Sequence, residues 1–356
     1  MLVYVGILIK QINMKTLKNS IKLFSLLTLS TFALTSCSDD DDNTMQEQPT
    51  VSTKLYTSNN ADGNITYYDV TDTSNITATT LVTTSVAADG VYFDGSSDTV
   101  IQASRSGFAL EGFDNVANIA SGTSVTAAVS GTADMSSPRE LAVSGNFYVV
   151  ADSADADGDV TTPDGRLFVY QKSGGQFVLR NTITTNFKLW GIVFNGQDLY
   201  AIVDTTGDLA VFSGFLSNNT DATVAASKRI TVEGIVRTHG IAFDANTNTA
   251  VLTDIGSAMD ASDGGFHVIS NFTTKLNATP NNGTLSVSQQ VRVAGNNTVL
   301  GNPVDVAYDG ATETVFIAEA ANGKILAFNN IGAGGNLTPA VNNNLMSASA
   351  VHLSKD

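Results

Sequence analysis

The chain has 356 residues, of which 42% are hydrophobic and only 15% are charged. Its 18 lysine and arginine residues face 34 aspartate and glutamate residues, which gives a formal net charge of −16 at pH 7. Such an acidic protein repels phosphate backbones and anionic lipid headgroups, so nucleic acid and acidic membrane surfaces are excluded as expected partners. A single cysteine excludes a disulfide within the chain.

The first 36 residues have the order of a secretory signal peptide. Three lysines, Lys15, Lys18 and Lys22, precede an apolar run from Leu23 to Leu34. That run is shorter than the ~20 residues that span a bilayer of roughly 30 Å. A charged segment followed by a short apolar segment therefore predicts a cleaved export signal, for which Met14 is a better start than Met1.

The only cysteine, Cys37, closes this signal in the order Leu34-Thr35-Ser36-Cys37. The segment resembles the bacterial lipoprotein box, in which the cysteine is acylated and becomes the first residue. The resemblance implies a stable membrane anchor, because several acyl chains hold a protein where one chain would be marginal.

An acidic run, Asp39 to Asp42, follows this cysteine directly. It resembles the export signal of surface lipoproteins in the Bacteroidetes, which implies an outer-membrane protein that faces the outside of the cell. The alternative is a plain solvated spacer. Residues 37–52 are polar and acidic, so we expect a disordered tether there.

From residue 53 onward, a unit of three short apolar segments recurs about every 50 residues. The clearest copy spans residues 191–195, 199–204 and 207–212. Each segment is rich in β-branched and aromatic residues and is bounded by Gly, Asp or Asn, which is typical of strands between turns. No segment of this region has a helical period. A repeat of this length built only from strands predicts a β-propeller.

The two incomplete copies at the ends of this region complete each other. Residues 350–354 form a first strand with no successor, whereas residues 54–58 and 63–68 form a second and a third strand with no predecessor. We therefore predict an all-β, six-bladed β-propeller over residues 53–356 that closes by pairing its terminal strands, which leaves no open edge in the ring.

The segment from Phe316 to Phe328 resembles the NHL-type repeat, which reads Val-Ala-Asp, a turn, Arg-Ile and an aromatic residue. Residues 148–152 and 165–170 match the same pattern across an insertion. The chain is thus similar to NHL/YncE-like six-bladed propellers. This resemblance implies the fold but no single activity, since such propellers include protein-binding modules, sugar-lactone hydrolases and lyases.

Bulky polar residues gather at the start of the first strand of each repeat, the strand expected beside the central channel. The candidate pocket residues are Asp89, Arg139, Glu140, Trp190, His239 and Asp305. Glu140 and Asp305 stand where sister repeats keep Gly. Convergent aromatic and charged groups at one opening are typical of a small-molecule pocket. The alternative is a plug in which these side chains bond to one another.

A second set of polar residues ends the second strand of each repeat. Its members are Ser58, Ser104, Asp152, Asp204, Asp254 and Glu319. Carboxylates at one level of a ring could hold a cation or a sugar. We expect instead that they accept hydrogen bonds from the backbone amides of the adjacent turn.

Calcium is the one metal for which the sequence offers ligands. Asp155, Asp157 and Asp159 alternate along an insertion, and alternating carboxylates suit a hard cation. The spacing departs from an EF-hand loop, because Val160 stands where that loop needs Gly. Three isolated histidines argue against zinc, and no other cofactor is indicated.

Two functions remain open at this stage. The first is a monomeric, lipid-anchored binding or scaffold module for a protein or glycan ligand. The second is a channel-sited hydrolase or lyase of the sugar-lactone type, for which Glu140, His239 and Asp305 are the hints. The sequence has no nucleophile elbow, phosphate loop or dinucleotide fingerprint, so we expect binding rather than catalysis.

Overall fold

The computed structural model describes residues 52–355. Cys37, the segment predicted as a signal peptide and residues 37–51 of the expected tether lie outside the described residues. Within the described range, no helix has both the length and the apolar character to cross a membrane.

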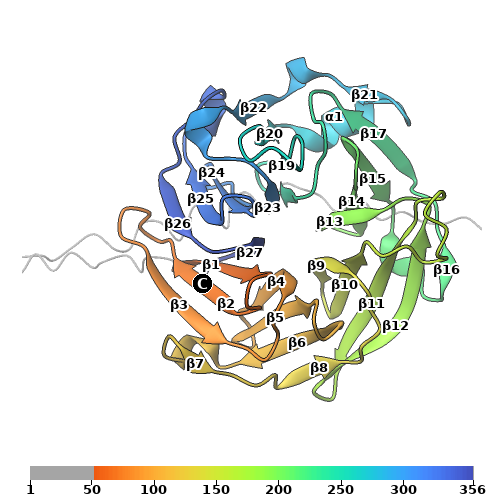
Figure 1. Cartoon of the computed structure of the whole chain (residues 1–356). Coiled ribbons are helices and arrows are strands. Elements are labelled where there is room, and N and C mark those ends of the chain that lie inside the picture. Colours follow the sequence, from red (N-terminus) through yellow and green to blue (C-terminus); the bar gives the residue numbers. More distant parts are fainter. Residues whose placement is uncertain (1–51, 356) are drawn as a thin grey trace, which may run out of the picture. The chain divides into compact units, whose positions relative to one another are not determined.

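The strands of residues 52–355 form five sheets around a common centre, with β4, β9, β13, β23 and β27 nearest to it (Figure 1). The first sheet joins the two ends of the region. In spatial order its strands are β27 (Ala348–Lys355), β1 (Thr53–Asn59), β2 (Ile65–Asp69), β3 (Thr77–Val82) and β7 (Thr123–Ser124).

The largest sheet has nine strands and consists of two antiparallel groups. The first group contains β4 (Ala88–Asp94), β5 (Thr99–Ser104), β6 (Ala109–Asp114) and β8 (Val129–Gly131). The second contains β9 (Pro138–Ser144), β10 (Phe147–Asp152), β11 (Gly165–Ser173) and β12 (Gln176–Thr185), with β16 (Ala222–Thr223) beside β12. Only a short parallel pairing joins the groups, with Gln176 opposite Ser130 and Phe177 opposite Gly131.

Three further sheets continue around the centre. The next contains β13 (Leu189–Asn195), β14 (Asp198–Val203), β15 (Asp208–Phe212), β17 (Lys228–Val232) and β21 (Thr284–Leu285). It is followed by β18 (Ile241–Asp244), β19 (Thr249–Asp254), β20 (Gly265–Ile269) and β22 (Val291–Ala294). The last contains β23 (Pro303–Asp309), β24 (Thr314–Glu319), β25 (Lys324–Phe328) and β26 (Val341–Asn344).

One α-helix, α1 (Phe272–Ala278), lies in the described residues and corrects the expectation that none occurs. Its seven residues are too few to carry a visible helical period, and only Phe272 and Leu276, four residues apart, are buried. Short 3₁₀ turns complete the connections. They are η1 (Val116–Asn118), η2 (Phe215–Ser217), η3 (Val287–Gln289), η4 (Asn296–Thr298) and η5 (Ile331–Ala333).

The predicted pairing of the terminal strands is confirmed. β27 pairs antiparallel with β1, from Lys355 opposite Thr53 to Ala348 opposite Asn59. The Ser58 and Ser349 hydroxyl groups lie 3.1 Å apart across this junction. Residues almost 300 positions apart in sequence thus belong to one sheet, and β1 is not left as an open edge.

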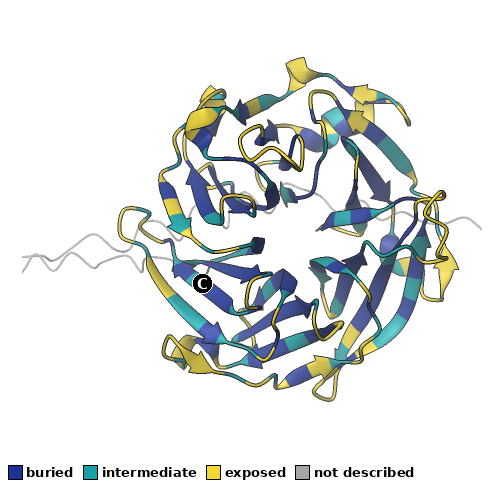
Figure 2. Ribbon diagram, in the orientation of Figure 1, coloured by how far each residue is buried: buried dark blue, intermediate teal, exposed yellow. Residues whose placement is uncertain are grey.

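The apolar core lies between neighbouring sheets. The middle strands β5, β19 and β24 are buried along their whole length, whereas exposed residues concentrate in the outer strands and loops (Figure 2). One cluster packs Leu55 of β1 and Val351 of β27 against Phe316 of β24. Burial of these faces is the main favourable contribution to folding, and it fixes the innermost strands that build the site.

Candidate functional site

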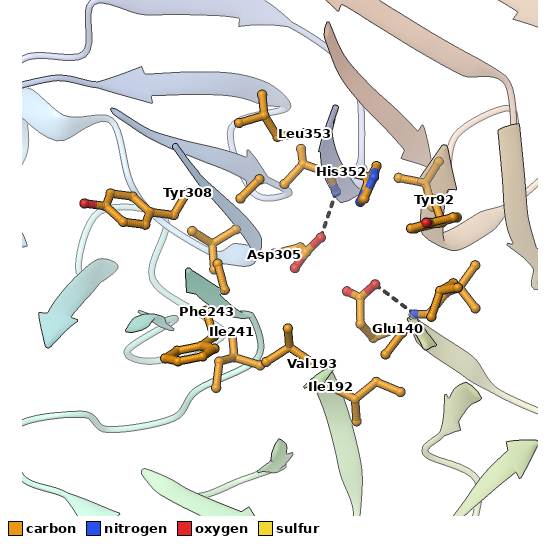
Figure 3. Close-up of a pocket in the computed structure, with 18 of the residues that line it drawn as sticks. Tyr92, Glu140, Ile192, Val193, Ile241, Phe243, Asp305, Tyr308, His352 and Leu353 are labelled. Carbon is orange, nitrogen blue, oxygen red and sulfur yellow. Dashed lines mark hydrogen bonds between the residues drawn. The ribbon is translucent and has the colours of Figure 1, made fainter. Parts of the chain in front are cut away.

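A cavity of about 250 Å³ lies at the centre of the ring of sheets. The innermost strands β4, β9, β13, β18, β23 and β27 all contribute to its wall, in which most of the side chains are aliphatic or aromatic. Lining residues shown in Figure 3 are Tyr92, Glu140, Ile192, Val193, Ile241, Phe243, Asp305, Tyr308, His352 and Leu353.

Two carboxyl groups, those of Glu140 and Asp305, face each other across this cavity (Figure 3). Asp305 is buried and accepts a hydrogen bond from the Val351 amide at 2.7 Å. Glu140 is half-buried and accepts one from the Leu141 amide at 2.8 Å. Backbone amides of two inner strands therefore hold both carboxyl groups in position.

Burial raises the pKa of both carboxyl groups. Desolvation together with repulsion from Asp305 raises the pKa of Glu140 well above its usual range. Desolvation also raises the pKa of Asp305 to about 7, although amide hydrogen bonds oppose the shift. A hydrogen bond between the two groups raises the pKa of Glu140 and lowers that of Asp305. Both carboxyl groups therefore hold a proton to a higher pH than ordinary carboxyl groups do.

Glycines at the same level of the inner strands explain why two repeats supply these acids. A Cβ at Gly240 would lie 2.7 Å from the Asp305 Cα, and one at Gly191 would lie 2.4 Å from the His239 carbonyl oxygen. A Cβ at Gly90 would lie 2.7 Å from the Leu141 nitrogen. Neighbouring strands thus approach too closely for a side chain at three positions.

The other four predicted pocket residues do not line the cavity; they form a chain of contacts among themselves. Asp89 pairs with Arg139 at 3.3 Å, and the Arg139 guanidinium lies 4.1 Å from the centre of the Trp190 ring. Trp190 in turn stacks on His239, with ring centroids 3.6 Å apart. The sequence therefore predicted one cluster, whereas the structure has two groups. In the second group, the side chains contact one another, as in the alternative in which they form a plug.

His239 also contacts Asp204, which the sequence analysis placed among the polar residues that end the second strands. The His239 Nε2 donates to Asp204 Oδ1 at 3.2 Å, and Arg237 binds the same oxygen at 2.8 Å. Desolvation lowers the pKa of His239 to about 4, so the ring is neutral at pH 7. Burial alone would raise the pKa of Asp204, but His239 and Arg237 lower it to about 2.

Sequence reasoning missed the aromatic part of the cavity wall. His352 lies beside Tyr92 with ring centroids 4.6 Å apart, and desolvation lowers the pKa of His352 to about 4. Phe243 and Tyr308 also line the cavity. A signal for Tyr92 and His352 was present, because the matching position in the other four copies of the first strand holds Ala or Val.

The acids that end the second strands tie loops together, as expected. Asp152 Oδ2 accepts the Ser136 and Ser137 amides at 2.6 and 2.9 Å, while its Oδ1 accepts the Ala154 amide. Asp254 and Glu319 make equivalent bonds to the loops before β18 and β23. These loops, which lead into the innermost strands, were not anticipated as partners; the sequence indicated only the adjacent turn.

The candidate calcium ligands are rearranged relative to the prediction. The structure brings together carboxylate oxygens of Asp155, Asp157 and Asp164, all within 4.8 Å of one another. Asp159 is not part of this group; its carboxylate accepts hydrogen bonds from the Thr161 amide and hydroxyl. Oxygen ligands of this kind suit a hard divalent cation.

No protein-family model matches the sequence, and no curated protein matches it. Solved structures do match over most of the described region. A chain of the nidogen–laminin complex is 13% identical with a TM-score of 0.54, and the match covers 85% of this chain and 98% of that chain. A 6-phosphogluconolactonase-like protein of Bacteroides fragilis is 11% identical with a TM-score of 0.56. The match covers 86% of this chain and 98% of that chain.

A protein from Lactobacillus plantarum is 15% identical with a TM-score of 0.52, covering 85% of both chains. The fold is that of a β-propeller. At these low identities the likeness extends to the fold alone, and the function must be argued from the propeller's own cavity.

Proposed function

We propose that this propeller is a lipid-anchored binding module of the cell surface, which holds an end group of a protein or glycan ligand in its central cavity. The observation that carries the proposal is the central cavity, whose wall combines aliphatic and aromatic side chains with the two carboxyl groups of Glu140 and Asp305. Ligand sites are typically concave and mostly apolar, with few polar groups that fix orientation.

Six blades are the count that best fits the sheets. The two groups of the nine-stranded sheet have separate innermost strands, β4 and β9, and only two residue pairs join them. Counting them as two blades gives six four-stranded units, in keeping with the NHL/YncE-like resemblance. The junction of β27 and β1 then completes the sixth blade.

The anchor and the location rest on the sequence before the propeller. In this proposal, residues 1–36 are a signal peptide, Cys37 is acylated, and residues 37–52 are a tether that carries the propeller at residues 53–356. Removal of the signal peptide leaves 14 basic against 34 acidic residues, because residues 1–36 contain four lysines and no acid. We propose that the propeller acts as a monomer, bound to the outer membrane only through this anchor.

A channel-sited hydrolase or lyase of the sugar-lactone type is the second candidate. The observation in its favour is the carboxyl pair, since an Asp305 with a pKa of about 7 can exchange protons at neutral pH. Against it, the described cavity lining contains no lysine or arginine to bind a phosphorylated sugar. Binding is therefore the better-supported function.

A ligand screen with a blocked cavity tests the proposal. The full-length protein is screened against glycans, peptides and small molecules by thermal shift, in parallel with Ala307→Leu, which places a larger side chain in the cavity wall. Ligands of the wild-type protein that fail to shift the variant support the proposal. Ligands that shift both proteins equally place binding elsewhere, and turnover of a sugar lactone that Glu140→Gln abolishes would favour the enzyme.

A further inference from the structure

We infer that the cavity takes a primary ammonium group at the end of an unbranched apolar chain, such as a lysine side chain or an alkylamine, with its nitrogen between the carboxyl groups of Glu140 and Asp305. This inference rests on the proposed binding function and names the chemical class of the ligand. It follows from the charge, the hydrogen-bonding groups and the shape of the cavity.

The charge of the cavity is unbalanced. Its described lining holds two carboxyl groups and no lysine or arginine. Two neighbouring carboxylates with little solvent and no counter-charge are costly, and the raised pKa values of Glu140 and Asp305 reflect that cost. A ligand cation supplies the missing positive charge, so the cavity favours a cation over a neutral or anionic ligand.

The polar groups at the carboxyl pair select the kind of cation. Both carboxyl groups are held by backbone amides, and as carboxylates they can only accept hydrogen bonds. A primary ammonium has three donors and can satisfy both groups at once. A quaternary ammonium has no donor and depends on aromatic faces, whereas Glu140 and Asp305 offer charged acceptors.

The rest of the wall matches a slender apolar chain. Apart from the carboxyl pair, the wall contains the aromatic residues Phe243 and Tyr308 and many aliphatic side chains, among them Ala142, Val193 and Ala307. A chain of five heavy atoms needs on the order of 150 Å³, taking roughly 30 Å³ for each atom as for a water molecule. The cavity of about 250 Å³ accommodates that volume without displacing the wall.

Binding of the ammonium favours the ionised form of both carboxyl groups. The alkylammonium enters with its charge, any proton that the pair holds is released to solvent, and both groups become carboxylates, so that charge and protons balance. Repulsion from Asp89 raises the pKa of both carboxyl groups, and no lysine or arginine lines the described cavity to oppose the ammonium. His352, Tyr92 and Tyr308 stay neutral at pH 7, because burial lowers the pKa of the histidine and raises those of the tyrosines. Affinity should therefore rise with pH, with release of the protons that the carboxyl pair holds in the free protein.

Calorimetry with a matched pair of probes tests the inference. The full-length protein is titrated with n-pentylammonium and with 1-pentanol, its neutral counterpart of similar length. We expect the ammonium to bind at least tenfold more tightly than the alcohol, with a proton release that appears as a dependence of the heat on the buffer. Glu140→Gln and Asp305→Asn should each weaken ammonium binding about tenfold or more, since a hydrogen bond to a charged group is lost.

Asp72→Asn is the charge-matched control, because Asp72 lies on an exposed turn away from the cavity, and it should leave binding unchanged. Equal binding of pentanol and pentylammonium, or full ammonium affinity in both Glu140→Gln and Asp305→Asn, would overturn the ammonium inference. The proposed function stands in that case if Ala307→Leu still blocks binding. If Asp305→Asn does not fold, Glu140→Gln and the comparison of the two wild-type titrations decide. Binding that Ala307→Leu leaves intact overturns both proposals.

Discussion

The indole ring of Trp190 lies flat on the imidazole of His239, with ring centroids 3.6 Å apart and planes inclined by only 4°. The stack holds His239 with 3% of its surface exposed and its Nε2 on Asp204. Because burial lowers the pKa of His239 to about 4, the folded protein resists protonation of a ring that titrates near 6.5 when unfolded.

This difference makes stability depend on pH in a defined window. The contribution of His239 is fully present above pH 6.5 and is lost as the pH falls toward 4, since the unfolded state binds the proton first. Across that window the loss is about 3 kcal/mol of unfolding free energy. We expect His239→Gln, which can still donate to Asp204, to flatten the profile between pH 6.5 and 4.5 in urea titrations. His352 shifts in the same direction, so only the difference between wild type and variant reports on His239. Parallel profiles would contradict the prediction.

Removal of the last strand should open the ring. Deleting Ser349 to Asp356 removes most of β27, takes Val351 out of the core and exposes β1 as an open edge. Burial of one such side chain contributes about 1.5–3 kcal/mol, and the strand carries several, so the loss is comparable with the whole stability of a domain. We expect a large fall in the melting temperature, measured by circular dichroism.

Two controls separate this effect from simple shortening of the chain. Removing Asp356 alone leaves every residue pair of the β27–β1 ladder from Lys355 to Ala348 in place and should change the melting temperature little. Adding a synthetic peptide of residues 348–356 to the shortened protein should restore part of the lost stability. An unchanged melting curve after deletion of the eight residues would show that the ring does not depend on this junction.

The insertion between β10 and β11 offers a matched pair of acids for a calcium test. Asp157 belongs to the cluster with Asp155 and Asp164, whereas Asp159 bonds to its own turn. If the loop binds calcium, millimolar calcium should raise the melting temperature of the wild-type protein and of Asp159→Asn. Asp157→Asn should lose the shift, and addition of a chelator should reverse it. The same shift in both variants would place the calcium elsewhere, and no shift in the wild-type protein would end the hypothesis.

Much of the fold was predictable because the residue types within a short segment determine whether it forms a buried strand. Strands such as β10 and β19 are continuous apolar runs that end at an Asp, and their boundaries follow from residue types alone. The outermost strands were not predicted. β3 and β26, for example, read Thr-Ala-Thr-Thr-Leu-Val and Val-Asn-Asn-Asn. Each has only one buried residue and therefore carries no apolar pattern. Pairing with a neighbour, which is not local, makes them strands.

The site was predictable in its residues but not in its grouping. The sequence placed Glu140 and His239 at one level of the ring, yet only Glu140 reaches the cavity, while His239 turns to Trp190 and Asp204. A shift of one residue along a strand reverses the face to which a side chain points. In the repeat, the residue that corresponds to Glu140 is Gly240, and His239 stands one residue earlier. An alignment that ignores the bulges in these strands therefore places Glu140 and His239 in one group.

The close approach of the inner strands gives a final test. Gly240 has an ordinary backbone conformation, so its need for glycine comes from crowding, since an added Cβ would lie 2.7 Å from the Asp305 Cα. The obstacle is backbone, which cannot rotate away. We expect Gly240→Ala to lower the unfolding free energy by about 1–3 kcal/mol through overpacking and to disturb the adjacent carboxyl pair. Gly332→Ala is the matched control, because a Cβ there meets nothing within 4 Å. Urea titrations of both variants measure the difference. If Gly240→Ala were as stable as Gly332→Ala, the two strands would have room to separate. Close approach of the backbone would then not explain the glycine at this position.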